Sequence, residues 1–267
     1  MADEILLAPS KKRKHRGGVA LSADIPVSEA GGTVAQAEAI LKDNGRIKQI
    51  SQVVDLPQWK QEICEIHVIG KTPLIVHAWS EKATRMMLRK QMGEASEGRE
   101  KKDPFADFKG SLYPVPGEKW QFGVPAPAFK ACAVTAANSV ELQMTKMRQA
   151  FHVQAYTVPI EADPIKAPIT EWDVKYKKEL KPYHEVGISM RMDIVRLETG
   201  VADLRFRAWW PKWKAKLEVE YNPRMISLAQ LLNLFRAGGF GCGICEWRPS
   251  APQCRSGEYG RFEIETK

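Results

Sequence analysis

The sequence lacks a long apolar run, and no stretch approaches the roughly 18 residues that a membrane-spanning helix needs. Apolar residues nevertheless make up 44 % of the 267 residues, which excludes a chain that is disordered throughout. The length suits one large domain or two small ones with a buried core. Asp3 and Glu4 stand near the start, and no apolar run of useful length precedes the basic patch, so we expect no signal peptide and a cytoplasmic protein.

Cysteine is scarce, and its spacing fits no metal site. Five cysteines without a secretion signal indicate reduced thiols. Cys242 and Cys245 form a C-x-x-C pair, but the histidine nearest in sequence, His184, is remote. A thioredoxin-like motif would open a helix, whereas this pair precedes an expected strand. We therefore expect neither a metal nor a cofactor.

Catalytic signatures are also missing. The sequence contains no G-x-S-x-G and no H-E-x-x-H motif. The histidines of the body are scattered without ligand spacing: His67, His77, His152 and His184. His184 or His77 could serve as a general base toward RNA, but nothing in the sequence places a partner beside either. We expect a protein that is not an enzyme, with a metal-independent endoribonuclease as the alternative.

Positive charge is in excess, because 40 Lys and Arg residues face 32 Asp and Glu residues, a net charge of +8. Five of these cations surround His15 within residues 11–16. This segment is interpreted as a solvated arm, a nucleic-acid-contacting arm or an import-type basic signal. The remaining body is still positive, which weakly favours a polyanionic partner.

Three regions follow from the distribution of glycine, proline and charge. Residues 1–32 are expected to form a flexible basic lead-in. Residues 33–58 are expected to hold a short helix and a linker, because Thr33 and Gln36 form a capping-box pair. Residues 59–267 are expected to form the folded body.

The body alternates between strand-like and helix-like patterns. The order is strand, helix, strand, strand, helix, strand, from 62–69, 127–140, 150–160, 203–221 (interrupted at Pro211), 227–238 and the last strand pair, 244–247 with 259–264. This order predicts an α+β, ferredoxin-like (RRM-like) core. Large insertions are expected at 93–123 and at 161–185, the second as a protruding hairpin.

The densest local signal is the run of glycines between 238 and 243, directly after an apolar helix. Gly239, Gly241 and Gly243 could present backbone N–H groups that cradle a phosphate. The glycines follow a helix rather than precede one, so a Rossmann site is not expected. Arg248 and Arg261 frame a loop beside this turn. The alternative is a plain helix-to-strand loop whose arginines form surface ion pairs.

A second group of candidates lies on neighbouring expected strands. Arginine binds phosphates through paired hydrogen bonds, and aromatic rings stack on bases. An open ferredoxin-like sheet is the surface on which RNA-recognition folds use both. The RNP1 hexapeptide is absent, and a solvated sheet face over a Trp-rich core is the alternative. These candidates are Arg191, Arg196, Arg205, Arg207 and Trp209.

Three stretches resemble the RAMP superfamily, the repeat-associated proteins that form the backbone of CRISPR effector complexes. They are Ile63 to Val76, which contains Lys71; Val124 to Ala131, which contains Lys130; and Gly238 to Gly243 with the Gly-Tyr-Gly-Arg-Phe segment at 257–262. The ending Glu-Trp-Arg-Pro is also similar to that of uncharacterised bacteriophage proteins. The paired histidines of the repeat-processing members are missing, which puts nuclease activity in doubt.

The resemblance implies a ferredoxin-like palm with a hairpin thumb and subunits that polymerise along a single strand. It implies that Lys130 and the glycine loop lie near the phosphates, and that 161–185 form the thumb. We therefore predict a non-catalytic protein that binds single-stranded nucleic acid, RNA in preference to DNA. Copies would assemble side by side, as in the backbone of an antiviral CRISPR-type ribonucleoprotein, alone or with other subunits. A second alternative is a phage structural or interaction protein whose glycine loop and Trp-rich strands form a subunit interface.

Overall fold

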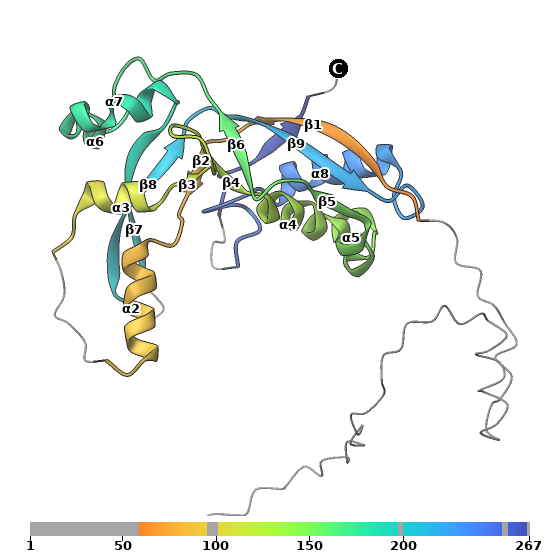
Figure 1. Ribbon diagram of the computed structural model, residues 1–267. Coiled ribbons are helices and arrows are strands. Elements are labelled where there is room, and N and C mark those ends of the chain that lie inside the picture. Colours follow the sequence, from red (N-terminus) through yellow and green to blue (C-terminus); the bar gives the residue numbers. More distant parts are fainter. Residues whose placement is uncertain (1–58, 95–100, 197–199, 253–255, 266–267) are drawn as a thin grey trace, which may run out of the picture. The chain divides into compact units, whose positions relative to one another are not determined.

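A computed structural model describes residues 59–94, 101–196, 200–252 and 256–265 (Figure 1). The expected lead-in and the expected helix within 33–58 lie outside these residues. The described body is α+β, and all of its strand pairs are antiparallel. Among the described residues, no helix is both long enough and apolar enough to cross a membrane.

The predicted ferredoxin-like order is confirmed. Its elements are β1 (Glu62–Gly70), α4 (Ala126–Ala136), β5 (Phe151–Val153), β6 (Thr157–Glu161), β9 (Lys214–Tyr221), α8 (Leu228–Gly241) and β10 (Phe262–Ile264). β10 and β9 flank β1, while β5 and β6 both pair with the other edge of β9. The expected strand at 150–160 is thus two short strands that share one partner.

Helices cover one face of this sheet. The sheet continues from β6 through β4 (Phe122–Pro125) to β3 (Tyr113–Pro114). In Figure 1, α4, α8 and α5 (Met144–Ala150) lie along the sheet. The short 3-10 helix η1 (Ala137–Val140) continues α4. Alternate residues of β1 and β9 point toward these helices, so Ile66 and Leu217 are buried with Phe235 of α8. The core therefore lies between the sheet and the helices, as the strand alternation predicts.

A second, three-stranded sheet has the order β2-β8-β7, from Leu74–Val76, Ala202–Trp210 and Ser189–Arg196. It is accompanied by α2 (Glu81–Gln91), α3 (Pro104–Gly110), α6 (Glu171–Lys175) and α7 (Lys177–Glu185). The fold does contain an inserted hairpin, β7 with β8, but 161–185 do not form it. The prediction of a hairpin at 161–185 is wrong, because that stretch contains α6 and α7.

The helices at 161–185 form because local caps outweigh the prolines. Thr170 and Asp173 make a reciprocal capping box at the start of α6. The buried carboxylate of Asp173 also accepts hydrogen bonds from Ser189 Oγ at 2.7 Å and from the backbone N–H of Met190 at 3.3 Å. His184 Nε2 of α7 lies 3.1 Å from the same carboxylate. One side chain thus fastens α6, α7 and the edge of β7 together.

We expect Asp173→Asn to lower the free energy of unfolding by about 2 kcal/mol at pH 7, because an amide cannot accept all of these hydrogen bonds. Burial acts to raise the pKa of Asp173, but the hydrogen bonds from Ser189, Ile169 and their neighbours outweigh it and lower the pKa. A lowered pKa stabilises the fold above the unfolded value of about 4, and this contribution is lost as the pH falls through the folded value.

Urea denaturation at pH 7 and at pH 3 measures this effect. The difference in unfolding free energy between the parent protein and Asp173→Asn should shrink at the lower pH. Asp163→Asn is the matched control, because Asp163 is exposed. A difference that stays constant over this range would contradict an ionised role for Asp173.

Candidate nucleic-acid interface

The predicted site residues fall into separate places rather than on one open sheet. Arg191, Arg207 and Trp209 belong to the small sheet, Lys71 and Arg261 lie beside β10, and Lys130 lies on α4. Arg196 is exposed near the end of β7. The structure therefore does not assemble the predicted set into one surface, and each place needs its own description.

The C-terminal segment, by which we mean residues 244–252 and 256–265, covers part of the small sheet. Arg207 has a side chain only 1 % exposed, with Nη1 3.5 Å from Asp193 and Nη2 3.5 Å from Glu246. Burial lowers its pKa. The prediction that Arg205 and Arg207 share an exposed face is wrong for Arg207, because Glu246 and Trp247 lie over it. A side chain enclosed in this way cannot clamp a phosphate.

Arg191 stands beside Arg207 in an aromatic cage. Its guanidinium lies 5.1–5.4 Å from the ring centroids of Trp209, Trp247 and Tyr259. It also donates to Asp193 Oδ1, with Nη2 at 2.6 Å. Trp209 thus stacks on an arginine of its own chain, where the sequence prediction had it stacking on a base. We name Arg191, Asp193, Arg207, Trp209, Trp247 and Tyr259 the arginine–aromatic cluster.

Arg205 remains accessible, but it has a carboxylate partner. Its Nε is 3.6 Å from Asp203, and the same carboxylate accepts a hydrogen bond from Lys102 Nζ at 2.9 Å. Arg248 donates to the carbonyl of Cys245 at 2.8 Å. Both arginines therefore bind acceptors of their own chain, and these contacts do not direct either side chain into an open groove.

The expected glycine loop is helical. Helix α8 continues to Gly241 instead of ending at Gly238, and Gly243 N–H donates to the Gly238 carbonyl. A Cβ at Gly239 would stand 2.2 Å from the carbonyl oxygen of Phe262, so the missing side chain serves close packing against β10. The N–H groups of Gly239 and Gly241 belong to the helix, and the prediction of a phosphate-cradling loop is wrong.

The expected strand at 244–247 is a series of turns. Gly243, Cys245 and Trp247 all have positive φ, at 65°, 63° and 54°. Such a backbone cannot continue a strand. It does bring Trp247 onto Arg191, and Glu246 N–H donates to the carbonyl of Ile75 in β2. The turns therefore fasten the C-terminal segment to the small sheet.

Lys71 and Arg261 lie together, because Lys71 N–H donates to the Arg261 carbonyl. Their charges are compensated: Lys71 Nζ is 2.5 Å from Glu263, and Arg261 Nη1 is 2.8 Å from Glu258. The Arg261 guanidinium also lies over the exposed ring of Phe240, 5.2 Å from its centroid. These ion pairs are exposed and easily opened, so both side chains remain weak candidates for a phosphate.

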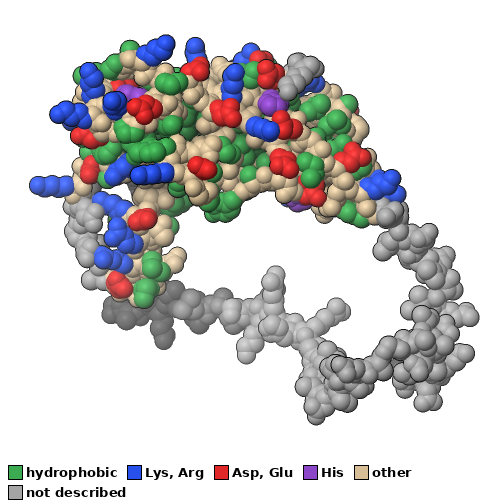
Figure 2. Space-filling model, turned by 45° about the horizontal axis from the view of Figure 1, so that its top comes forward, with side chains coloured by type: hydrophobic (Ala, Val, Ile, Leu, Met, Phe, Trp, Pro, Cys, Tyr) green, Lys and Arg blue, Asp and Glu red, His purple; other side chains and the backbone are tan. Residues whose placement is uncertain are grey.

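The open face of the large sheet is not an RNA-recognition surface. Its cross-strand pairs are Glu65 with Glu218 and His67 with Lys216. Lys216 is 2.5 Å from Glu65, and no arginine–aromatic platform stands on these strands. Figure 2 likewise shows acidic and basic side chains interspersed over the visible face of the body. The expected role of this sheet in stacking bases is therefore not supported.

A groove beside Lys130 differs from all of these places. Its lining comes from α4, α5 and the end of β5, and its volume is about 510 Å³. Lys130, Arg148 and His152 lie on it with apolar side chains such as Met144 and Val153, and its lining contains no Asp or Glu among the described residues. We name this feature the Lys130 groove.

The cations of the Lys130 groove are held by short elements. Pro127 lies in the first turn of α4 and starts the helix three residues before Lys130. Lys130 Nζ is 3.0 Å from His152 Nδ1, and burial lowers the pKa of Lys130. Tyr156 is 86 % exposed next to the groove, and its carbonyl accepts the N–H of Ala126.

Sequence reasoning found Lys130 but missed Arg148, His152 and Tyr156. The sequence did contain one sign of a groove, because the helix that carries Lys130 consists mostly of small residues. Ala131 and Thr135 leave room along the outside of α4, where larger side chains would fill the groove. The contact of α4 with the glycines of α8 runs instead through Cys132, so Lys130 and those glycines do not form one site.

The structure gives the candidate catalytic histidines other surroundings. His184 is held by Asp173, as described above. His77 is partly buried after β2, and burial together with Arg207 lowers its pKa. Burial raises the pKa of Cys132, Cys242 and Cys245, which keeps these thiols protonated. No group of His, Cys, Asp or Glu suited to a metal occurs in the described part of the chain.

Comparisons with known proteins show a weak structural similarity. No protein-family model matches the sequence, and no curated protein matches it. The crystal structure of Cmr6 from Pyrococcus furiosus aligns with 78 % of this chain and 100 % of its own, at 12 % identity and a TM-score of 0.34. A similarity of this strength does not establish a family, so the resemblance to the RAMP superfamily stays a prediction.

Proposed function

We propose that the protein binds single-stranded nucleic acid in the Lys130 groove, without catalysis, and that copies lie side by side along the strand. The groove carries this proposal, because it places Lys130, Arg148 and His152 around an apolar floor with no acidic residue in its lining. A surface with cations and no carboxylates attracts a polyanion. The net charge of +8 acts in the same direction.

The chemistry of the groove suits a flexible strand rather than a duplex. Lys130 and Arg148 can each neutralise a phosphate, and the release of counterions then supplies most of the affinity. Met144 and Val153 offer apolar contact to a sugar or a base. A base stacked on the exposed ring of Tyr156 would add about 1–3 kcal/mol. The preference for RNA over DNA rests on the sequence resemblance alone.

We expect the double change Lys130→Gln with Arg148→Gln to weaken binding of a 30-nucleotide single strand about 10- to 100-fold at 0.1 M salt, since two charge-assisted contacts are lost. The slope of log K against log salt should become shallower by about 1.4, which corresponds to two phosphates on a single strand. Fluorescence anisotropy titrations at several salt concentrations measure both quantities.

Lys216→Gln is the matched control, because Lys216 is paired with Glu65 on the open face of the large sheet, away from the groove. It should change the affinity less than twofold, and the RNA should remain intact after incubation with every variant. Equal affinity and equal salt slope in the double variant and the parent protein would overturn the assignment of the groove. Cleaved RNA would favour the endoribonuclease alternative.

A further inference from the structure

Helix α2 stands away from the rest of the body. Figure 1 shows it projecting beyond the small sheet, and none of its eleven residues is buried. Ser80 caps its first turn by accepting the N–H of Ala83 at 3.2 Å. A helix of this length is marginal in water by itself. Met86 and Met92 are 64 % and 66 % exposed, so α2 presents apolar surface that nothing in the described chain covers.

The polar side chains of α2 are mainly cationic. Lys82, Arg85, Arg89 and Lys90 accompany one acidic residue, Glu81. This helix therefore combines positive charge with flexible methionines, which adapt to aromatic surfaces. A partner for it needs carboxylates and aromatic rings in one hollow.

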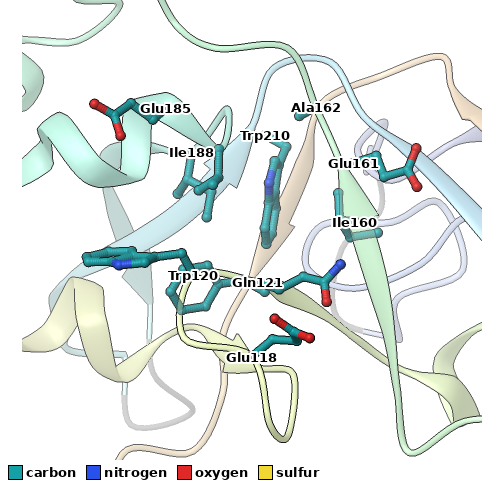
Figure 3. A pocket seen from close by; sticks show the side chains of 11 residues that line it. Glu118, Trp120, Gln121, Ile160, Glu161, Ala162, Glu185, Ile188 and Trp210 are labelled. Carbon is teal, nitrogen blue, oxygen red and sulfur yellow. The ribbon is translucent and has the colours of Figure 1, made fainter.

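Such a hollow exists elsewhere on the same chain. A cavity of about 550 Å³ is lined by Glu118 and Trp120 from the loop before β4, Glu161 at the end of β6, Glu185 at the end of α7 and Trp210 at the end of β8. Its lining contains no Lys or Arg among the described residues, and it contains no residue of α2. Figure 3 shows Trp210 in the middle of this lining, with Glu185 and Glu161 on opposite sides. We name it the acidic cavity.

Two tryptophans form part of the cavity wall. Trp210 is 1 % exposed, and its Nε1–H has no hydrogen-bond partner in the described part of the chain. The buried Nε1–H groups of Trp172 and Trp209 also have no partner among the described residues, so the wall contributes to docking through its apolar surface and its carboxylates. Trp120 lies at the rim, 43 % exposed, where its ring can receive a cation.

We propose that α2 of one copy docks into the acidic cavity of the next copy. Lys90 would meet the carboxylates, and Met86, one turn earlier on the same face of the helix, would pack on the exposed indole of Trp120. The two surfaces are different patches of the same chain, so the contact is head-to-tail and can extend into a row. This inference rests on the side-by-side assembly in the proposed function and identifies the surfaces that would produce it.

Two variants separate the surfaces. Arg85→Glu with Lys90→Glu changes the helix and leaves the cavity intact, whereas Glu118→Gln with Glu185→Gln changes the cavity and leaves the helix intact. Sedimentation velocity without nucleic acid, at 50 mM salt and up to 100 µM protein, should show the parent protein forming species larger than dimers. Each variant alone should associate at least tenfold more weakly.

An equimolar mixture of the two variants gives the decisive result. Only the helix of the cavity variant and the cavity of the helix variant remain compatible, so the mixture should form dimers and stop there. Glu218→Gln, on the exposed face of β9, is the control and should associate like the parent protein. Melting followed by circular dichroism shows whether each variant is folded.

Other outcomes would overturn the docking of α2. A parent protein that stays monomeric at 100 µM contradicts it, and so do folded variants that associate as strongly as the parent. Loss of affinity for a 12-nucleotide strand in the helix variant, without any self-association of the parent, would assign α2 to nucleic acid instead. The 12-nucleotide strand reports on the Lys130 groove of one copy, so failure of the groove and failure of this contact are told apart.

Discussion

Replacement of Arg207 by alanine will lower the free energy of unfolding by about 3 kcal/mol, because it empties a buried site and removes one of the two arginines that neutralise Asp193. Asp193 is buried beside Arg207, and Glu246 reaches the other guanidinium nitrogen. The loss should be measured by urea denaturation at pH 7. It should be smaller in an Asp193→Asn background, where one of the two carboxylates has been neutralised.

Arg205→Ala is the matched control on the same strand, two residues away. Its side chain is 32 % exposed and pairs with Asp203 at the surface, so the expected loss is below about 1 kcal/mol. If Arg207→Ala instead unfolds like the parent protein and binds nucleic acid more weakly, then Arg207 is exposed in solution. The C-terminal segment would in that case not cover the small sheet as described.

The sequence predicts which side chains share a face of a strand, but it does not predict which other segment covers that face. Alternation correctly places Arg205, Arg207 and Trp209 on one side of β8 and Phe206 on the other. Local pattern cannot show that Glu246 and Trp247, some forty positions later, pack over Arg207 on the first side. The expected binding surface was therefore half of a buried ion-pair network, in which Asp193 on the neighbouring strand and Glu246 from the C-terminal segment both pair with Arg207.

Local sequence patterns also predict the wrong secondary structure for two segments, because tertiary packing determines their conformation. Prolines within 161–185 argued against helices, yet the buried hydrogen bonds of Asp173 hold α6 and α7 in place. Consecutive glycines argued for a loop after Gly238, yet the absence of side chains is what lets α8 lie against β10. The Lys130 groove could be predicted only in part, because a hollow depends on what small residues such as Ala131 leave empty.

Gly239→Ala will test this account of the glycines most directly. A Cβ at Gly239 would stand 2.2 Å from the Phe262 carbonyl oxygen and 2.6 Å from its ring, which are contacts that backbone and core cannot relieve cheaply. We expect a loss of about 3 kcal/mol in the free energy of unfolding, the upper part of the usual range for an overpacked core. Urea denaturation measures it, and the loss should fall largely on the packing of α8 against β10.

Gly241→Ala is the matched control in the last turn of the same helix. No atom lies within 4 Å of a Cβ built there, so alanine should be tolerated and should gain about 0.5 kcal/mol by restricting the unfolded chain. Neither change should alter the salt dependence of nucleic-acid binding, since both N–H groups belong to the helix. If Gly241→Ala is folded but loses affinity, the glycine segment touches the strand after all, and the Lys130 groove is not the whole interface.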